Sequence, residues 1–173
     1  RSRQTGLSMH RRHLIAGLAL AGLVAPSARA TVPGEGLFSH LIGEWDVTGQ
    51  TRGRATATGA VVSRLFGGPF IELLIKDPTG RSPYVARVFF GMDVKGGLVV
   101  HWLDATGGES SKTLGFGRLE ADAAVFSFAY PDGTFRDRLS YDAGADTWRL
   151  RIETGDEASP VVFSDWRFTR RAR

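Results

Sequence analysis

Apolar and polar residues alternate along most of the chain, in short runs separated by clusters of glycine, proline and aspartate. Trp148, Leu150 and Ile152, for example, alternate with the charged residues Arg149 and Arg151. This period of two is typical of a β-strand that buries one of its faces. The pattern predicts ten strands, at residues 44–51, 55–66, 70–76, 84–92, 98–104, 112–120, 124–129, 134–141, 147–153 and 161–169.

The order and spacing of these runs predict an all-β fold. Strands that follow one another across short turns pair antiparallel, and closing such a meander into a barrel removes its exposed edges. We therefore expect a single antiparallel up-and-down β-barrel of about ten strands, with a two-sheet sandwich as the alternative. Beyond the N-terminal segment, only Gly36–Ile42 has helical spacing, and we expect this short helix to plug one end of the barrel.

The first 30 residues have the pattern of an export signal. Met9 begins a segment in which two arginines precede an apolar run from Leu14 to Val24, and the small residues Ala28 and Ala30 follow. This order is that of a cleavable signal peptide. The expected organisation is residues 1–30 as upstream residues and a signal peptide starting at Met9 and cleaved after Ala30, 31–43 as a linker with the short helix, and 44–170 as the barrel.

Two export pathways fit this segment. The adjacent Arg11 and Arg12 resemble a twin-arginine signal, and an ordinary Sec signal that contains two arginines is the alternative. Either signal predicts a periplasmic or secreted protein. The apolar run is too short to span a bilayer, so we expect no stable membrane anchor.

Composition and charge exclude several classes of function. The chain has no cysteine, which excludes disulfides, thiolate metal sites and a cysteine nucleophile. Five of the 22 basic residues precede Thr31, whereas all 18 acidic residues follow it, so the part from Thr31 onward is close to neutral. A nucleic-acid-binding protein needs a dense basic surface. We therefore expect no nucleic acid among the partners.

Three short motifs follow one another along the predicted barrel: Gly43-Glu44-Trp45, Gly67-Gly68-Pro69-Phe70 and Trp102-Leu103-Asp104-Ala105-Thr106-Gly107. In this order they resemble a large bacterial family of exported lipocalin-like domains of unknown function. Members of that family read Gly-x-Trp, then Gly-Gly-x-Phe, then Trp-x-Asp-x-x-Gly. The resemblance covers about residues 37–169. It implies a closed, calycin-type barrel with a lumen, and it implies no established reaction.

A more distant resemblance concerns cofactors. Nitrobindin-like barrels also begin with Gly-x-Trp, and they hold haem iron through a histidine near the C-terminal end. Here the last histidine is His101, so the resemblance does not extend to haem. The predicted barrel and its helix contain one other histidine, His40, and two histidines without paired spacing do not indicate a metal site. We expect neither a cofactor nor a metal.

Four charged residues, Glu72, Arg87, Asp137 and Asp165, share a predicted strand face with apolar neighbours. An ionised group on an apolar face is costly unless it is paired, so each side chain either points outward or faces the lumen with a partner. His101 lines the lumen if its neighbour Val99 points inward; otherwise it is a half-buried histidine bonded to the backbone. In the inward case the expected ligand-binding residues are Trp45, Phe70, Glu72, Arg87, Phe89, His101, Asp137 and Tyr141.

Three functions compete on these observations. The leading hypothesis is an exported barrel that binds a small apolar or amphipathic molecule in its lumen. A cofactor-independent isomerase, cyclase or lyase is the second, with Glu72, Arg87, His101 and Asp137 as candidate catalytic residues. An envelope interaction module that uses the outside of the barrel is the third, and a large exposed apolar patch would favour it. The sequence leaves open whether the protein is an enzyme, and it leaves open the oligomeric state.

Overall fold

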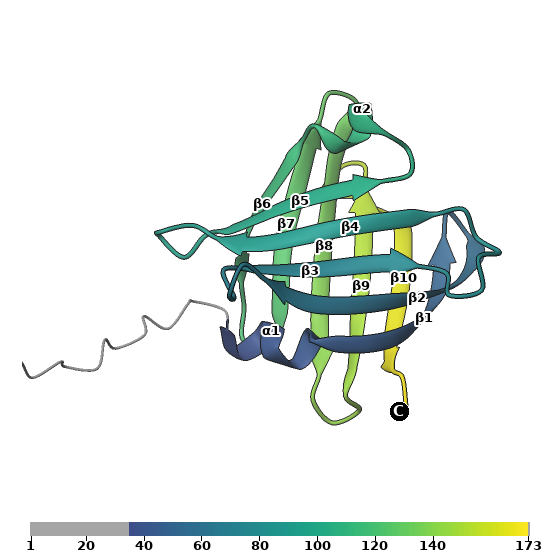
Figure 1. Ribbon diagram of the computed structural model, residues 1–173. Coiled ribbons are helices and arrows are strands. Elements are labelled where there is room, and N and C mark those ends of the chain that lie inside the picture. Colours follow the sequence, from purple (N-terminus) through teal and green to yellow (C-terminus); the bar gives the residue numbers. More distant parts are fainter. Residues whose placement is uncertain (1–34, 173) are drawn as a thin grey trace, which may run out of the picture. The chain divides into compact units, whose positions relative to one another are not determined.

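Ten antiparallel strands form a closed barrel in the computed structural model, which describes residues 35–172 (Figure 1). Every predicted strand is present, and each predicted end lies within two residues of the observed one. The strands are β1 (Gly43–Thr51), β2 (Arg54–Leu65), β3 (Phe70–Lys76), β4 (Val85–Met92), β5 (Leu98–Asp104), β6 (Leu114–Leu119), β7 (Ala123–Tyr130), β8 (Gly133–Asp142), β9 (Thr147–Thr154) and β10 (Val161–Arg170).

Two short helices accompany the strands. Helix α1 (Glu35–Leu41) precedes β1 and matches the predicted helix to within one residue. Helix α2 (Gly108–Ser111) lies between β5 and β6 and was not predicted. The two helices lie at opposite ends of the barrel, which we call the α1 end and the α2 end (Figure 1).

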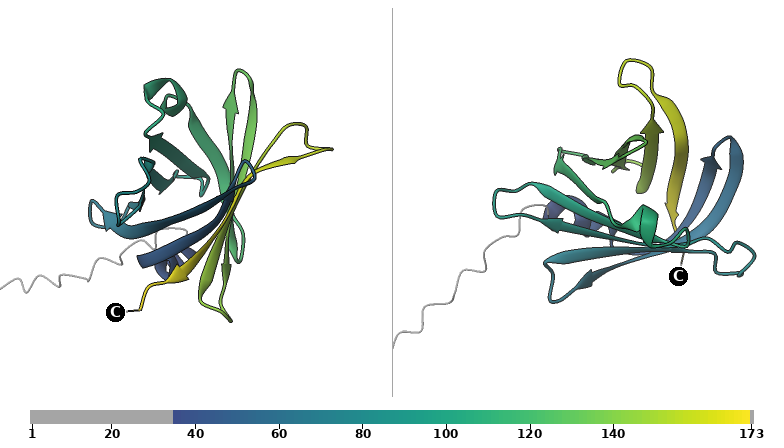
Figure 2. Two further views of the ribbon diagram at one scale, coloured as in Figure 1. Left: turned by 90° about the vertical axis from the view of Figure 1, so that its right-hand side faces the viewer. Right: turned by 90° about the horizontal axis from the view of Figure 1, so that it is seen from above.

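Each strand pairs with the next one along the chain, and β1 also pairs with β10. The closing seam runs from the pair Trp45–Arg170 to the pair Thr51–Ser164. The result is a closed meander rather than the two-sheet sandwich (Figure 2). Because successive turns alternate between ends, the turns after β1, β3, β5, β7 and β9 all lie at the α2 end.

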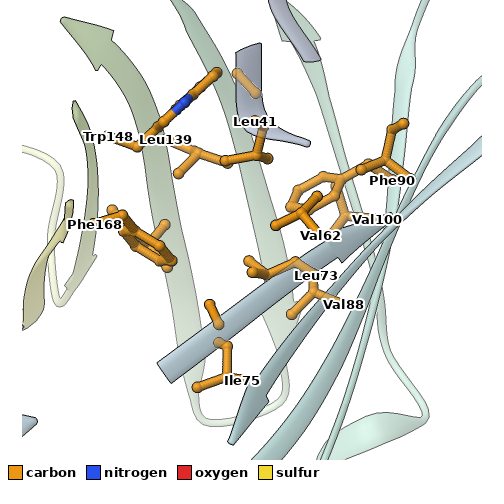
Figure 3. Close-up of a cluster of buried hydrophobic side chains, with 14 of the residues drawn as sticks. Leu41, Val62, Leu73, Ile75, Val88, Phe90, Val100, Leu139, Trp148 and Phe168 are labelled. Carbon is orange, nitrogen blue, oxygen red and sulfur yellow. The ribbon is translucent and has the colours of Figure 1, made fainter. Parts of the chain in front are cut away.

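The inner face of the barrel is apolar over most of its length. On β3, Ile71, Leu73 and Ile75 point inward and are at most 4% exposed. Side chains from all around the barrel meet them, including Trp148 and Phe168, which are fully buried (Figure 3). Such close-packed burial is the main source of stability in a chain without disulfides.

Two glycines on the inner face of β6 permit close contact with β7. A Cβ at Gly115 would lie 2.8 Å from the ring of Phe128, and a Cβ at Gly117 would lie 2.6 Å from the Cα of Phe126. Strand glycines of this kind permit close packing. Gly115 therefore leaves room for the ring of Phe128, and Gly117 lets the two backbones approach each other.

Helix α1 is joined to the barrel through its apolar side. Phe38 and Leu41 are buried, and the ring of Phe38 lies 5.3 Å from the ring of Phe90 on β4. The indole of Trp45 donates a hydrogen bond to the Leu41 carbonyl at 2.8 Å. These contacts fix the helix against the first strand.

The predicted signal peptide, with its start at Met9 and cleavage after Ala30, lies outside the described residues. Among residues 35–172, no helix has the length and hydropathy needed to cross a membrane.

Candidate functional site

Glu72 and Arg87, two of the candidate catalytic residues, lie on the outside of the barrel. Their strand neighbours Leu73 and Val88 are fully buried, so the alternation along β3 and β4 turns the two charged side chains outward. There the guanidinium of Arg87 forms an ion pair with the carboxylate of Glu72. The expectation that they line the lumen is wrong, because a period-two pattern does not say which face points inward.

His101 is also on the outer face. Val100 is fully buried and Trp102 packs against the core, so the face of β5 that carries Val99 and His101 points outward. The imidazole Nε2 of His101 lies 2.8 Å from the carbonyl oxygen of Ser111 in α2. His101 is therefore the half-buried, backbone-bonded histidine of the alternative interpretation.

Phe70 and Phe89, expected as ligand contacts in the lumen, share this outer face. Phe70 is 41% exposed, and its ring covers the backbone of Gly91 on β4. Phe89 stands directly opposite Glu72 and His101 in the antiparallel pairing. The interior ligand-binding role expected for these two residues is therefore also wrong.

Trp45 and Tyr141 do belong to the interior, and both lie at the α1 end. Trp45 is fully buried. The ring of Tyr141 is sandwiched between those of His40, at 4.7 Å, and Trp148, at 4.9 Å. Its hydroxyl donates a hydrogen bond to Asp146. The contacts of both residues are with other parts of the protein, and their predicted role in ligand binding stays a prediction.

Asp137 is the one candidate catalytic residue that faces the interior. It is 3% exposed and stands opposite Phe126 on β7 and Ile152 on β9. Its Oδ1 is buried and has no hydrogen-bond partner among residues 35–172. Burial raises the pKa of this carboxyl from 3.8 to about 8. Asp137 is therefore a buried acid that its protein surroundings leave unsatisfied.

A hydrogen-bonded group of three residues lies at the α2 end. The hydroxyl of Tyr84, just before β4, donates to the carboxylate of Asp104 at 3.1 Å. The indole of Trp102 donates to the same hydroxyl at 3.3 Å. All three side chains are partly exposed, and Trp102 and Asp104 lie on the inward face of β5. Solvent therefore reaches the interior face at this end.

Aromatic rings connect this end with the centre of the barrel. Phe126 contacts Phe128 at 5.9 Å, Phe128 contacts Tyr130 at 6.1 Å, and Tyr130 contacts Phe135 at 5.6 Å. Phe135 in turn contacts Phe163 at 5.1 Å. Phe126 and Phe128 are buried, whereas the last three rings are partly exposed. The series therefore leads from the core to solvent.

We define the interior site as the hydrogen-bonded group at the α2 end, the partly exposed rings of this series and the buried acid. Its residues are Tyr84, Trp102, Asp104, Tyr130, Phe135, Asp137 and Phe163. Its electrostatic character is acidic. Burial raises the pKa of Tyr84, and the charge of Asp104 adds to the shift. Burial likewise raises the pKa of Tyr130, with further contributions from Asp137, Asp104 and Asp132. Several carboxyl groups thus act on the same small region.

The interior site brings acids and phenols together without a basic partner for Asp137. The predicted quartet of Glu72, Arg87, His101 and Asp137 does not assemble, because only Asp137 faces inward. No cluster of three metal-ligating side chains occurs in the described part of the chain. A depression elsewhere on the surface is polar, and it is lined by Thr48, Gly49, Arg149, Asp165 and Arg167.

The sequence interpretation did not include Tyr84, Trp102, Asp104 and Tyr130 in the site. Asp104 precedes a glycine-containing turn, and the backbone and hydroxyl of Thr106 in that turn donate hydrogen bonds to its Oδ1. The alternation of Leu98, Val100, Trp102 and Asp104 would have placed the last two residues on the more apolar face of that strand. The predicted strand 84–92 began at Tyr84, and its alternation would have placed Tyr84 on the same face as Ala86 and Val88, although the observed β4 begins at Val85.

The comparisons with known proteins concern the fold. No protein-family model matches the chain. No curated protein is significantly similar to it in sequence. A redesigned β-barrel is similar in structure, with 15% sequence identity and a TM-score of 0.36, over 79% of this chain and 96% of that chain. This similarity is limited to the barrel fold.

Proposed function

We propose that the protein binds a small amphipathic molecule inside the barrel, at the interior site. The main observation behind this proposal is a set of inward-facing rings that are partly exposed at the α2 end. Beside them lies the buried carboxyl of Asp137, whose Oδ1 has no hydrogen-bond partner among the described residues. Ligand sites commonly combine apolar walls with a few polar groups in this way. The rings of Trp102, Tyr130 and Phe135 would bury the apolar part of the ligand.

The two ends of the barrel differ in exposure, and this difference supports entry of the ligand at the α2 end. At the α1 end, Phe38, Leu41 and Trp45 are at most 4% exposed. We propose that α1 closes this end as a plug. The ligand would then enter at the α2 end, where the interior residues keep contact with solvent.

A fluorescent apolar probe tests the proposal. N-Phenyl-1-naphthylamine is uncharged at neutral pH, and its emission rises when it leaves water. We expect saturable binding to residues 31–173, with about tenfold weaker binding in Tyr130→Ala, since burial of an aromatic ring contributes on the order of 1–3 kcal/mol. Phe116→Ala, on the outer face of β6, is the matched control. Unchanged binding in Tyr130→Ala with loss in Phe116→Ala would contradict an interior site.

The resemblance to exported lipocalin-like domains leads to the same proposal, since those domains are closed barrels with a lumen. We propose the same calycin-type relationship here, carried by the Gly-x-Trp motif at Trp45. We further propose export to the periplasm or the medium, on the pattern of Met9 to Ala30. Mass spectrometry of the mature protein would test this through an N-terminus at Thr31.

One observation favours an interaction function as a second candidate. The outer face of β2–β6 carries Glu72, Arg87 and His101 together with many apolar residues. We call the apolar set the outer apolar face: Val61, Leu65, Phe70, Leu74, Phe89, Val99, Leu103, Leu114 and Phe116. The outer face of β8–β10 instead carries ion pairs such as Arg149–Asp165. A contiguous exposed apolar patch commonly marks a contact with another protein.

A further inference from the structure

The interior site has a consistent chemical character. Asp104 and Asp137 face it, and Asp132 lies in the adjoining turn between β7 and β8. The guanidinium of Arg52 also contacts the site, at 4.8 Å from the ring centroid of Phe163. Carboxyl groups surrounded by aromatic rings are the combination that recognises organic cations, because the ring faces are electronegative.

Asp137 supplies an independent indication that something is missing from the site. Its side chain is 3% exposed, it faces inward, and its Oδ1 has no partner among the described residues. Arginines precede and follow Asp137 in the sequence, and both have other partners. Arg136 donates to the carbonyl of Gly155 at 2.8 Å, and Arg138 forms ion pairs with Glu120 and Asp122. Burying a carboxyl group without a hydrogen-bond donor is unfavourable in free energy, and a donor on a bound ligand would remove this penalty.

Other aspartates show what a structural acid looks like in this chain. Asp77 accepts hydrogen bonds from the hydroxyl of Thr79 and from the backbone of Thr79 and Ser82, which lower its pKa to about 2. Asp93 accepts from the backbone of Lys95 and Gly97 in the same manner. These carboxylates organise their turns. Asp137 organises nothing of this kind, because it lies mid-strand with its backbone already in the β8 pairing.

We propose that the ligand of the interior site is an amphipathic organic cation, whose protonated amine contacts the carboxylate of Asp137 and whose apolar part packs on the neighbouring rings. This inference rests on the proposed function, since it names the ligand class of the same site. Phe126 and Phe135 flank Asp137 and Tyr130 lies beyond them. An alkyl or aryl ammonium ion would satisfy the carboxylate and bury its chain in one step.

Affinity for such a ligand depends on pH through the groups that face the site. On the neighbouring strands, Asp137 meets uncharged residues, Phe126 and Ile152. The titratable groups of the interior site and its adjoining turn are Tyr84, Asp104, Tyr130 and Asp132, and the guanidinium of Arg52 contacts the ring of Phe163. Because burial raises the pKa of Asp137 to about 8, an ion pair requires loss of its proton near neutral pH. Affinity for an amine should therefore increase between pH 6 and pH 8.

A matched pair of probes tests the assignment. n-Octylammonium and n-octanol have the same chain and differ in the charged head group. Isothermal titration of residues 31–173 at pH 7.5 should show at least tenfold tighter binding of the amine, and this preference should decrease toward pH 6. Asp137→Asn should remove the preference while it keeps the affinity for octanol, which also shows that the variant is folded. Asp165→Asn, an outer-face acid paired with Arg149, should retain the preference.

The outcomes separate the inference from the function on which it rests. Equal affinity of the wild-type protein for the two probes, or a preference that persists in Asp137→Asn, would overturn the assignment to a cation and leave an interior apolar site intact. Failure of both probes and of N-phenyl-1-naphthylamine to bind would overturn the interior site itself. Tighter binding of the amine that is lost in Asp165→Asn would assign the cation to the outer face instead.

Discussion

The guanidinium of Arg170 lies 4.1 Å from the ring centroid of Trp45, so the last residue of β10 covers the buried indole of β1. The same guanidinium donates to the carbonyl of His40 at 2.9 Å and to the carbonyl of Ile42 at 3.1 Å. It also forms an ion pair with Asp146. A single side chain thus joins α1, the closing seam and the turn between β8 and β9.

We expect Arg170→Ala to destabilise the barrel by about 1–3 kcal/mol. The substitution removes a cation–π contact and two hydrogen bonds to carbonyls that follow or end α1. The ion pair adds little to this figure, because the Arg170 side chain is 38% exposed. Urea denaturation followed by tryptophan fluorescence measures the change. Arg167→Ala, an exposed position on the outer face of β10, should change the free energy of unfolding by less than about 0.5 kcal/mol.

The buried acid Asp137 should make the protein less stable as pH rises. Its pKa is 3.8 in the unfolded reference and about 8 in the folded chain, so the folded state holds the proton more tightly. The contribution of Asp137 to the free energy of unfolding is fully present below about pH 4. It decreases as the pH rises to about 8, by an amount on the order of a few kcal/mol. Urea denaturation at intervals between pH 4 and pH 8 measures the slope.

Two variants separate this slope from the other titrating groups. Asp137→Asn should flatten it, and the variant should be more stable than the wild-type protein at pH 8. Asp165 makes the protein more stable as pH rises, which is the opposite effect, because its hydrogen bonds with Arg149 lower its pKa in the folded chain. Its contribution is present above the unfolded value and disappears as pH falls below it. A wild-type slope that survives in Asp137→Asn would refute the assignment.

The strands were predictable because each one carries its own alternation and each turn its own breakers. The ends of β3 and β5, for example, match the prediction to the residue. The inward face was less predictable, since Glu72 and His101 alternate as regularly as Leu73 and Val100 do. Which face of a strand points inward depends on its cross-strand neighbours, and those of Glu72 and His101 lie between 9 and 17 positions away along the chain.

A single methyl group on β6 should be poorly tolerated. A Cβ at Gly117 would lie 1.9 Å from the carbonyl oxygen of Val125 and 2.6 Å from the Cα of Phe126, so the β6–β7 pairing would have to separate. We expect Gly117→Ala to cost about 2 kcal/mol or more, by the mechanism of overpacking. Gly108→Ala is the control, because nothing lies within 4 Å of a Cβ there. Equal melting temperatures for the two variants would contradict this description of the interior.

The outer apolar face should drive association between two copies of the chain. Leu65, Phe70, Val99 and Phe116 form one registered row across β2–β6, interrupted only by Gly91 under the ring of Phe70. The adjacent Glu72–Arg87 pair carries both charges, so a two-fold axis would place the arginine of one copy near the glutamate of the other.

Sedimentation velocity at several concentrations checks this arrangement. We expect a concentration-dependent dimer for the wild-type protein and a monomer for Phe116→Asp, because a charge placed within an apolar contact must lose its water. Val161→Asp introduces the same charge at an equally exposed valine of β10, away from the row, and should leave the dimer intact. A wild-type protein that stays monomeric at 100 μM, on the order of a hundredfold above a micromolar dissociation constant, would eliminate self-association and leave the row for a different protein partner.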